Sequence, residues 1–350
     1  MSLEKDKHHT MKHILVVFTG GTIGSSASDG TIKPSESAPF KLLGEFQWRF
    51  PEAAKDIAFE SIEPIRMLSE NLAPAAWPII IEAIEAKQPE RYDGVIVTHG
   101  TDTLAYTAAA LSFYFHGLKV PLLMVSSDYP LDHPKANGLD NFHCAVDFIR
   151  EIKDPGVFVP YRNQGQTLQV HRGARLASSP QLSGDFFSVQ GQSYLEYDGG
   201  RFIGTGMPAF KRQAELPKLK PLFSDRILMI RPYPGLDYAH FSLDGVDAVL
   251  HDLYHSGTAC STLQWGDNHS LLAFIKRCRQ QGVKLYLAPA RQSPDAYEST
   301  RCLLDAGAEM IWNQSIEAAY VKLALAYGNF QEGQDIAAFL AVDMAGEHVH

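Results

Sequence analysis

The chain has 350 residues, of which 45% are hydrophobic, and a formal net charge of −9 at pH 7, so it is long enough to bury a large core and to divide into two domains. An acidic chain without clustered Lys and Arg is not expected to bind nucleic acid or an anionic membrane surface. No apolar run approaches the length of about 18 residues that predicts a membrane span, and the charged N-terminal residues do not resemble a secretory signal. We therefore expect a cytoplasmic protein whose partner is a small molecule.

Along the first 206 residues, short β-branched runs alternate with helical patterns. Each predicted strand is a nearly continuous apolar run, as expected for a parallel sheet that is covered on both faces. The helical segments carry apolar residues at intervals of three and four, with a polar opposite face. The alternation predicts a doubly wound α/β domain, with strands at 14–18, 95–98, 120–126 and 157–161 and helices at 74–87, 103–116 and 138–152.

A second series follows the stretch 207–225, whose Pro and Lys content is typical of a linker. It predicts strands at 227–231, 248–253, 283–288 and 310–313, and helices at 269–281, 297–306, 316–326 and near 334–345. The chain is thus expected to be of the α/β class, with two domains. The larger one (11–206) would hold a doubly wound, mainly parallel sheet, and after the linker a smaller one (226–350) would hold a second parallel sheet.

Two similar stretches come directly after predicted strands, TGGTIG (19–24) and THGTDT (98–103). In a doubly wound sheet ligands bind at the carboxyl ends of the strands. Glycine there lets the backbone turn sharply, and the following threonine presents a hydroxyl. Two alternatives compete with a catalytic role. Neither spacing matches a phosphate-binding loop, whereas structural turns with capping threonines remain open.

The second stretch adds a carboxylate and an imidazole to the hydroxyls. Asp102 follows the second Gly-Thr pair at once, and His99 precedes it. We interpret His99 as a packed, hydrogen-bonded histidine beside the turn rather than as a catalytic base. The grouping favours a site at the ends of the first two predicted strands.

Together with MLSENLAPAAW (67–77) and PLLMVSSDYPL (121–131), the segments TGGTIG and HGTDTLAYTAAALSF resemble the bacterial L-asparaginases over nearly the whole chain, particularly the cytoplasmic type I branch. The resemblance implies two α/β domains in a homodimer or homotetramer, with each active site near a neighbour's C-terminal domain. It also implies hydrolysis of the side-chain amide of L-asparagine to L-aspartate and ammonia, without metal or organic cofactor.

The family's site residues carry over position by position. Thr22 matches the nucleophile, and Thr101 with Asp102 matches the second threonine and the aspartate of the site. Ser69 and Glu70 match the pair that holds the α-carboxylate and α-ammonium groups of the substrate.

The chemistry of amide hydrolysis fits these residue types. An amide is a poor electrophile, so the site must supply a nucleophilic oxygen, a proton relay and donors for the oxyanion. A threonine supplies the oxygen but needs a proton acceptor within about 2.6–3.2 Å. Backbone N–H groups around Gly21 or Gly100 are uncovered enough to serve as oxyanion donors. Asp102 suits a substrate ammonium, and we include both glycines with it among the predicted substrate-binding residues.

The chain departs from the family pattern at four positions. In place of the family's RGxRxxK it has RGARLAS from residue 172, which puts Ser178 where the lysine belongs. Thr31 stands where the type I pattern has a tyrosine, Asn137 where the family has an aspartate, and Thr258 where the neighbouring subunit contributes an asparagine. Without a cation at 178, a slower or differently wired proton relay is expected.

Three nearby residues are candidates to replace that cation, namely His171, Arg172 and Arg175. An arginine is a poor proton acceptor, and pairing with Asp185 is the alternative expectation for it. Two classes of function therefore remain open. One is an amidohydrolase, acting on asparagine or on another amide. The other is an impaired homologue that binds aspartate-like amino acids through Ser69, Glu70 and Asp102.

The remaining features are expected to be structural. The loop 25–39 has the composition of a lid, with an ordinary exposed connection as the alternative. Cys144, Cys260, Cys278 and Cys302 are spaced too widely for a CxxC site, and we expect reduced core cysteines. The ending EHVH (347–350) is a poor metal site, so no metal site is predicted.

Overall fold

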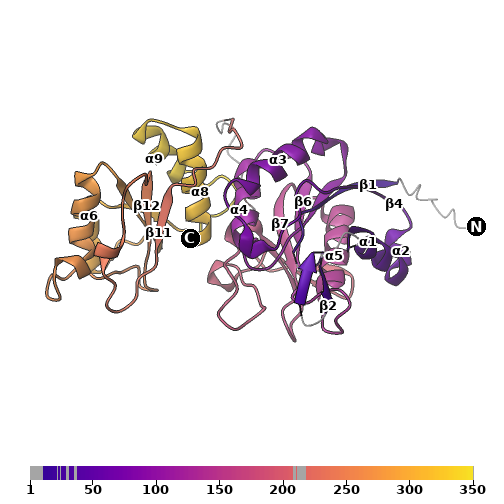
Figure 1. Ribbon diagram of the computed structural model, residues 1–350. Helices are drawn as coiled ribbons and strands as arrows, with labels where there is room; N and C mark the ends of the chain where they lie inside the picture. The colour runs from indigo at the N-terminus through magenta and orange to yellow at the C-terminus, as the bar shows by residue number, and fades with distance from the viewer. Residues whose placement is uncertain are drawn as a thin grey trace, which may run out of the picture.

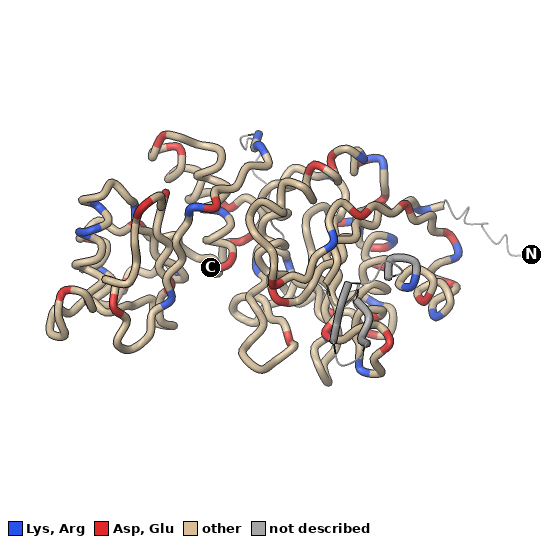
Figure 2. The backbone as a smooth tube through the Cα atoms, viewed as in Figure 1, with Lys and Arg blue, Asp and Glu red and all other residues tan. Residues whose placement is uncertain are grey.

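The computed structural model describes residues 11–21, 23, 25–28, 31–34, 38–207, 210 and 218–349, and for 25–28, 31–34 and 38–40 it describes the backbone alone. The chain forms two halves that lie side by side (Figure 1). Each half is built on its own sheet, and Lys and Arg are interspersed with Asp and Glu in both (Figure 2).

The larger sheet has eight strands in the order β10-β9-β8-β7-β6-β5-β1-β4. Its first five members from the β4 edge, β4, β1, β5, β6 and β7, are parallel, and β8, β9 and β10 extend it antiparallel. The strands are β1 (Lys12–Phe18), β4 (Ile57–Ile62), β5 (Gly94–Thr98), β6 (Pro121–Val125), β7 (Gly156–Tyr161), β8 (Leu168–Arg172), β9 (Leu195–Asp198) and β10 (Arg201–Gly204).

Helices cover both faces of this sheet, and alternate side chains of β1 show how. Leu15 and Val17 belong to the core cluster formed with α3 and α4, whereas Ile14 and Val16 belong to the cluster formed with α1 and α5. Successive side chains of a strand point to opposite faces, so an uninterrupted apolar run is what a doubly covered strand needs. The helices are α1 (Ala38–Arg49), α2 (Pro51–Ala54), α3 (Ala76–Ala86), α4 (Leu104–Tyr114) and α5 (Gly138–Asp147), which continues as a π-helix over Phe148–Ile152.

The smaller sheet is all parallel, in the order β11-β12-β13-β14. Its strands are β11 (Ile227–Ile230), β12 (Ala248–Asp252), β13 (Lys284–Ala290) and β14 (Glu309–Trp312), and its helices are α6 (Leu271–Gln280), α7 (Glu298–Asp305), α8 (Ile316–Asn329) and α9 (Gly333–Ala341). Helix α8 packs against α4 of the other half, so one apolar cluster runs through both halves. This explains why α4 is buried nearly all round.

The α/β fold class with a large and a small sheet is confirmed, and each strand and helix named from the sequence is present with its ends shifted by a few residues. The sequence patterns missed α1, α2, the edge strand β4 and the antiparallel extension β8 to β10. They also missed a hairpin of β2 (Ser25–Ser28) and β3 (Thr31–Pro34). The division at 206 and 226 stays a prediction, because the middle of the expected linker, residues 208, 209 and 211–217, lies outside the described residues. Within the described ranges, every helix is too short or too polar to cross a membrane.

Candidate active site

The two Gly-Thr loops touch each other. Strands β1 and β5 are parallel neighbours with Phe18 opposite Thr98, so both chains leave the sheet at the same edge. A Cβ atom added to Gly21 would lie 2.3 Å from the backbone nitrogen of Gly100 and 2.5 Å from its Cα. Gly21 also has φ +80°, a conformation that favours glycine. Side chains are therefore excluded where the two loops cross.

A third segment, which leads to Ser69, fits against the same crossing. The backbone N–H of Gly21 donates to the carbonyl of Met67 at 3.0 Å, and Met67 N donates to Thr19 O at 3.1 Å. A Cβ atom on Gly100 would lie 2.4 Å from Ser69 Oγ. Because Met67 takes the N–H of Gly21, the expected oxyanion donors are better sought at residues 100–101.

Ser69 ties this segment to the start of α4. Its Oγ donates to Asp102 Oδ2 at 2.9 Å and accepts from the backbone nitrogen of Asp102 at 3.2 Å, while Thr103 Oγ1 donates to Ser69 O at 3.0 Å. Ser69 is buried, Thr101 is half-buried, and Asp102 and Glu70 are exposed. The structure thus brings Ser69, Gly100, Thr101 and Asp102 together, with the carboxylate open to a ligand.

The structure does not describe the side chains of two predicted site residues, Thr22 and Thr31. Thr22 lies outside the described residues, and Thr31 is the first residue of β3 in a part of the chain where the backbone alone is described. The expected lid at 25–39 contains the β2–β3 hairpin. The nucleophile, the tyrosine position and lid closure remain predictions.

His99 is a buried, neutral histidine. Its Nδ1 lies 2.8 Å from the carbonyl of Gly100, and because a carbonyl oxygen only accepts, Nδ1 carries the proton. Burial lowers the pKa of His99 to about 4. These contacts agree with the interpretation of His99 as a packed residue beside the turn.

Ser178, the predicted position of the family's lysine, is hydrogen-bonded to a carboxylate from the other half. The backbone N–H of Ser178 donates to Glu317 Oε1 at 2.9 Å, and Glu317 is a buried residue in the first turn of α8. The sequence interpretation missed Glu317, although a glutamate two residues after the helix-capping Ser315 is a visible signal.

The candidates to replace the missing cation are engaged elsewhere. Nδ1 of His171 lies 2.9 Å from Ser188 Oγ. The guanidinium of Arg172 lies 4.4 Å from the ring centroid of Tyr194. Arg175 donates to the carbonyl oxygens of Gly346 and His348. The expected pairing of an arginine with Asp185 is wrong, since Arg175 binds those carbonyls and Asp185 accepts from the backbone of Gln164.

The other two departures have local roles. Asn137 is buried and exchanges hydrogen bonds with Asp128 between β6 and α5, at 3.0 and 3.1 Å. Thr258 Oγ1 lies 2.9 Å from Ser256 Oγ in the loop after β12. A contribution of Thr258 to a neighbouring subunit's site stays a prediction.

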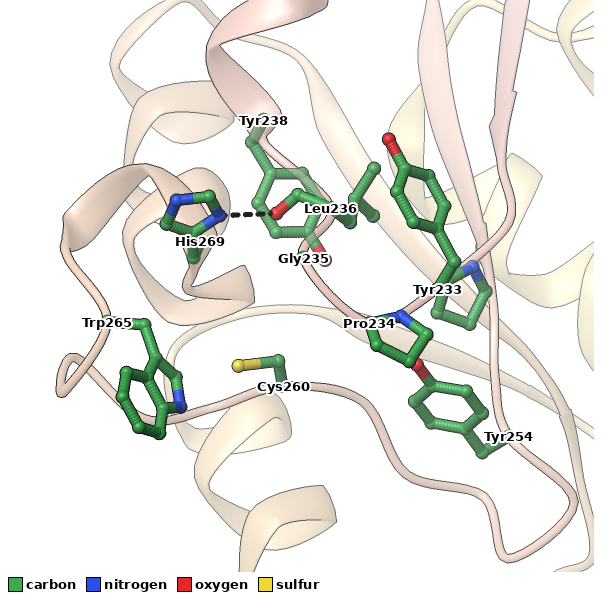
Figure 3. A pocket seen from close by; sticks show the side chains of 10 residues that line it. Tyr233, Pro234, Gly235, Leu236, Tyr238, Tyr254, Cys260, Trp265 and His269 are labelled. Atoms are coloured by element: carbon green, nitrogen blue, oxygen red, sulfur yellow. Dashed lines mark hydrogen bonds between the residues drawn. The ribbon is translucent and has the colours of Figure 1, made fainter.

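The smaller half carries a separate cavity of about 550 Å³, which the sequence patterns did not indicate (Figure 3). Tyr233, Tyr254 and Trp265 line it with Cys260 and His269. The lining is mostly aromatic and aliphatic and lacks the predicted site residues, so we place the chemistry at the Gly21–Gly100 crossing instead. All four cysteines are free, but only Cys144 and Cys278 are buried; the expected core position is wrong for Cys260, which is exposed in a loop, and Cys302 is half-buried. Among the residues that the structure describes, no three His, Cys, Asp or Glu side chains are grouped to hold a metal ion.

Two sheets flanked by helices, with the Gly21 and Gly100 loops in contact where neighbouring strands of the larger sheet end, define a two-sheet α/β protein with a candidate site at those strand ends. The protein-family model described as asparaginase, N-terminal, matches residues 13–201. The chain therefore belongs to the asparaginase family.

The chain is similar to two groups of relatives over most of their length, glutamyl-tRNA(Gln) amidotransferase subunits and an L-asparaginase. The chain is 27% identical to a glutamyl-tRNA(Gln) amidotransferase subunit of Aeropyrum pernix, over 99% of this chain and 81% of the relative. It is 28% identical to the L-asparaginase of Thermococcus kodakarensis, over 95% and 98%. The structure of the latter protein aligns with a TM-score of 0.79 at 23% identity, covering 97% of this chain and 99% of that one.

L-asparaginase I of Vibrio cholerae aligns in structure with a TM-score of 0.78 at 26% identity, over 97% of this chain and 100% of that chain. The family is therefore shown. Membership of the bacterial type I branch is not shown, since archaeal amidotransferase subunits are among the sequence relatives.

Proposed function

We propose that the protein hydrolyses the side-chain amide of L-asparagine, with Thr22 as nucleophile and Thr101 in the proton relay. The observation that carries this proposal is the contact of Gly21 with Gly100, 2.5 Å from an added Cβ to the facing Cα. Thr22 and Thr101 directly follow those two glycines in the chain. A site that needs two hydroxyls at one substrate is well served by loops that touch.

We propose that the exposed carboxylates of Asp102 and Glu70 recognise the substrate. Asp102, oriented by Ser69, and Glu70 offer negative charge to an α-ammonium group through charge-assisted hydrogen bonds. The hydroxyl hydrogen of Ser69 goes to Asp102 in the free protein, so we propose that it turns to the α-carboxylate when the substrate binds. This distribution of charge fits a free amino acid better than a neutral amide.

The proposed reaction has two halves. The hydroxyl oxygen of Thr22 attacks the amide carbon, its proton passes to the relay, and the oxyanion accepts from backbone N–H groups at residues 100–101. The nitrogen takes a proton and leaves as ammonia, after which water hydrolyses the ester. Because Ser178 replaces the lysine, we expect slower turnover than a lysine-containing relay would give.

A second candidate is a component that releases ammonia for a partner protein. It is favoured by the match to the amidotransferase subunit of Aeropyrum pernix over 99% of this chain. In that case the isolated chain would turn over slowly, and activity would rise only when the partner is bound.

Ammonia release from L-asparagine, L-glutamine and D-asparagine tests the proposal. We expect release from L-asparagine that is lost in Thr22→Val and Thr101→Val and retained in Thr262→Val, a matched variant in the other half. Release in all three variants would overturn the proposed roles. Absence of release from every amide at high enzyme concentration, with aspartate still bound, would identify a binding protein instead.

A further inference from the structure

The last described residues form a segment that joins the two halves. We name residues 342–349 the closing segment; it follows α9 and reaches the junction between the halves (Figure 1). Met344, Glu347 and Val349 are all buried there. A segment of irregular backbone that is this buried must have its polar groups paired.

Arg175 of the larger half binds the backbone of the closing segment. Its Nε donates to the carbonyl of Gly346 and its Nη2 to the carbonyl of His348. Gly346 has φ +76°, and an added Cβ would lie 3.2 Å from the ring of Phe210 and 3.5 Å from Arg172 Cδ. Position 346 therefore lies directly on the stretch that includes Arg172 and Arg175.

The smaller half holds the closing segment from the other side. Lys322 of α8 pairs with Glu347 at 2.6 Å, and both side chains are fully buried. Glu347 also accepts from the backbone nitrogens of Met344 and Ala345. Val349 N donates to Asn313 O at 2.7 Å. The closing segment is thus fixed to α8 and to the end of β14 before it meets Arg175.

The stretch 173–175, which includes Arg175, packs against helix α4, the helix that follows the candidate site residues. An added Cβ on Gly173 would lie 2.6 Å from Ser112 Oγ and 3.0 Å from Ala108 O, both in α4. Helix α4 begins at Leu104, directly after Thr101, Asp102 and Thr103. After β8, residues 173–175 form a single 3₁₀ turn, so side-chain contacts must hold this stretch in place.

We propose that Arg175 is a positioning residue. By binding the backbone of the closing segment it holds residues 172–178 against α4 at the proposed site. The proposal rests on the proposed amide hydrolysis for its kinetic consequence. Its structural part, the attachment of residues 342–349, is independent of catalysis. Arg175 therefore supports the site by binding the backbone of the closing segment. It does not take the role in proton transfer of the family's lysine.

The test compares Arg175→Met and Arg175→Lys with Arg277→Met. Arg277 also donates to two backbone carbonyls, those of Tyr238 and Phe241, but within the smaller half. We expect Arg175→Met to lower kcat about ten- to hundredfold through misplacement of the site and to speed amide exchange in 342–349 and 172–178. Lysine should restore part of both effects, and Arg277→Met should change neither.

Wild-type kcat and KM with a released closing segment would overturn the proposal, as would unchanged exchange in 342–349. If Arg175→Met does not fold, Gly346→Ala tests the same contact with Arg175 intact and should give the same loss. If the wild type releases no ammonia, the proposed function fails. The positioning role is then judged from exchange and from the affinity for L-aspartate, which should fall in Arg175→Met but not in Arg277→Met.

Discussion

Ser69 and Asp102 hold each other by two hydrogen bonds that use the same hydroxyl oxygen. Ser69 Oγ donates to the carboxylate at 2.9 Å and accepts from the Asp102 N–H at 3.2 Å. A residue that follows one strand thereby sets the orientation of a carboxylate that follows another. The pair places a fixed negative charge beside the Gly21–Gly100 crossing.

Replacing Ser69 with alanine removes both hydrogen bonds. We expect a loss of about 1–2 kcal/mol of unfolding free energy, because the partly buried N–H of Asp102 loses its acceptor. The KM for the amide should rise about tenfold as the carboxylate loses its orientation. Urea unfolding and initial rates measure the two effects. Ser242 makes the same reciprocal bonds with Asp244 in the smaller half, so Ser242→Ala should leave KM unchanged.

An alanine at Gly21 tests the crossing of the loops. Its Cβ would meet the backbone of Gly100 at 2.3 Å, and φ is +80°. We expect a destabilisation of about 3 kcal/mol or more, together with loss of ammonia release. Gly165 has φ +69° with open space around its Cβ, so Gly165→Ala should cost only about 1 kcal/mol. Equal losses in the two variants would contradict a close contact.

The relay can be tested by restoring the residues that the family pattern has. The double variant Ser178→Lys with Thr31→Tyr should raise kcat by about tenfold or more, because it returns a cation and a phenol to the relay. Glu317, which binds the backbone at 178, offers the new ammonium a counter-ion. Ser179→Lys places the same charge one residue away and should have no effect. An unchanged or lower rate in the double variant would count against the alignment at 178.

Stability should fall as pH rises through neutrality because of the closing segment. Burial raises the pKa of Asp343 to about 7, and the neighbouring Glu347 adds to the shift. Burial alone would raise the pKa of Glu347 as well, but Lys322 lowers it to about 2. The positive charges that interact electrostatically with the Asp343 carboxylate are those of Lys322, Arg172 and Arg175. Below about pH 7 the folded pair therefore holds one proton, on Asp343.

Asp343 holds that proton when folded but loses it near pH 3.8 when unfolded. Its contribution to stability is thus complete below about pH 3.8 and is lost as pH rises through about 7. Asp343→Asn mimics the protonated form and should be more stable than the wild type at pH 8, with a flatter profile between pH 6 and 8. Asp335→Asn, at an exposed site in α9, is the control for charge removal. Parallel profiles for wild type and Asp343→Asn would disprove the shared proton.

The parallel core strands were predictable because burial on both faces leaves a strong pattern. Strand β5 is buried along its whole length and carries three successive apolar residues, Val95 to Val97, before Thr98, so its existence and its end follow from the residues. Strand β4 lies at an edge and has the exposed polar residues Glu60 and Ser61, and β8 to β10 pair antiparallel, so these short segments lack such a run. Local pattern is weak where one face or one edge meets solvent.

The amino-acid sequence by itself determined the α/β class, the two Gly-Thr loops at strand ends and the absence of the family's lysine at Ser178. These are local properties, because they depend on residue type, spacing and strand burial. Only the tertiary structure decided that Gly21 faces Gly100, that Ser69 binds Asp102 and that Arg175 holds the closing segment. Such contacts join residues 33 to 173 positions apart. Their geometry depends on the order of the strands and the packing of α8 on α4, which no local pattern specifies.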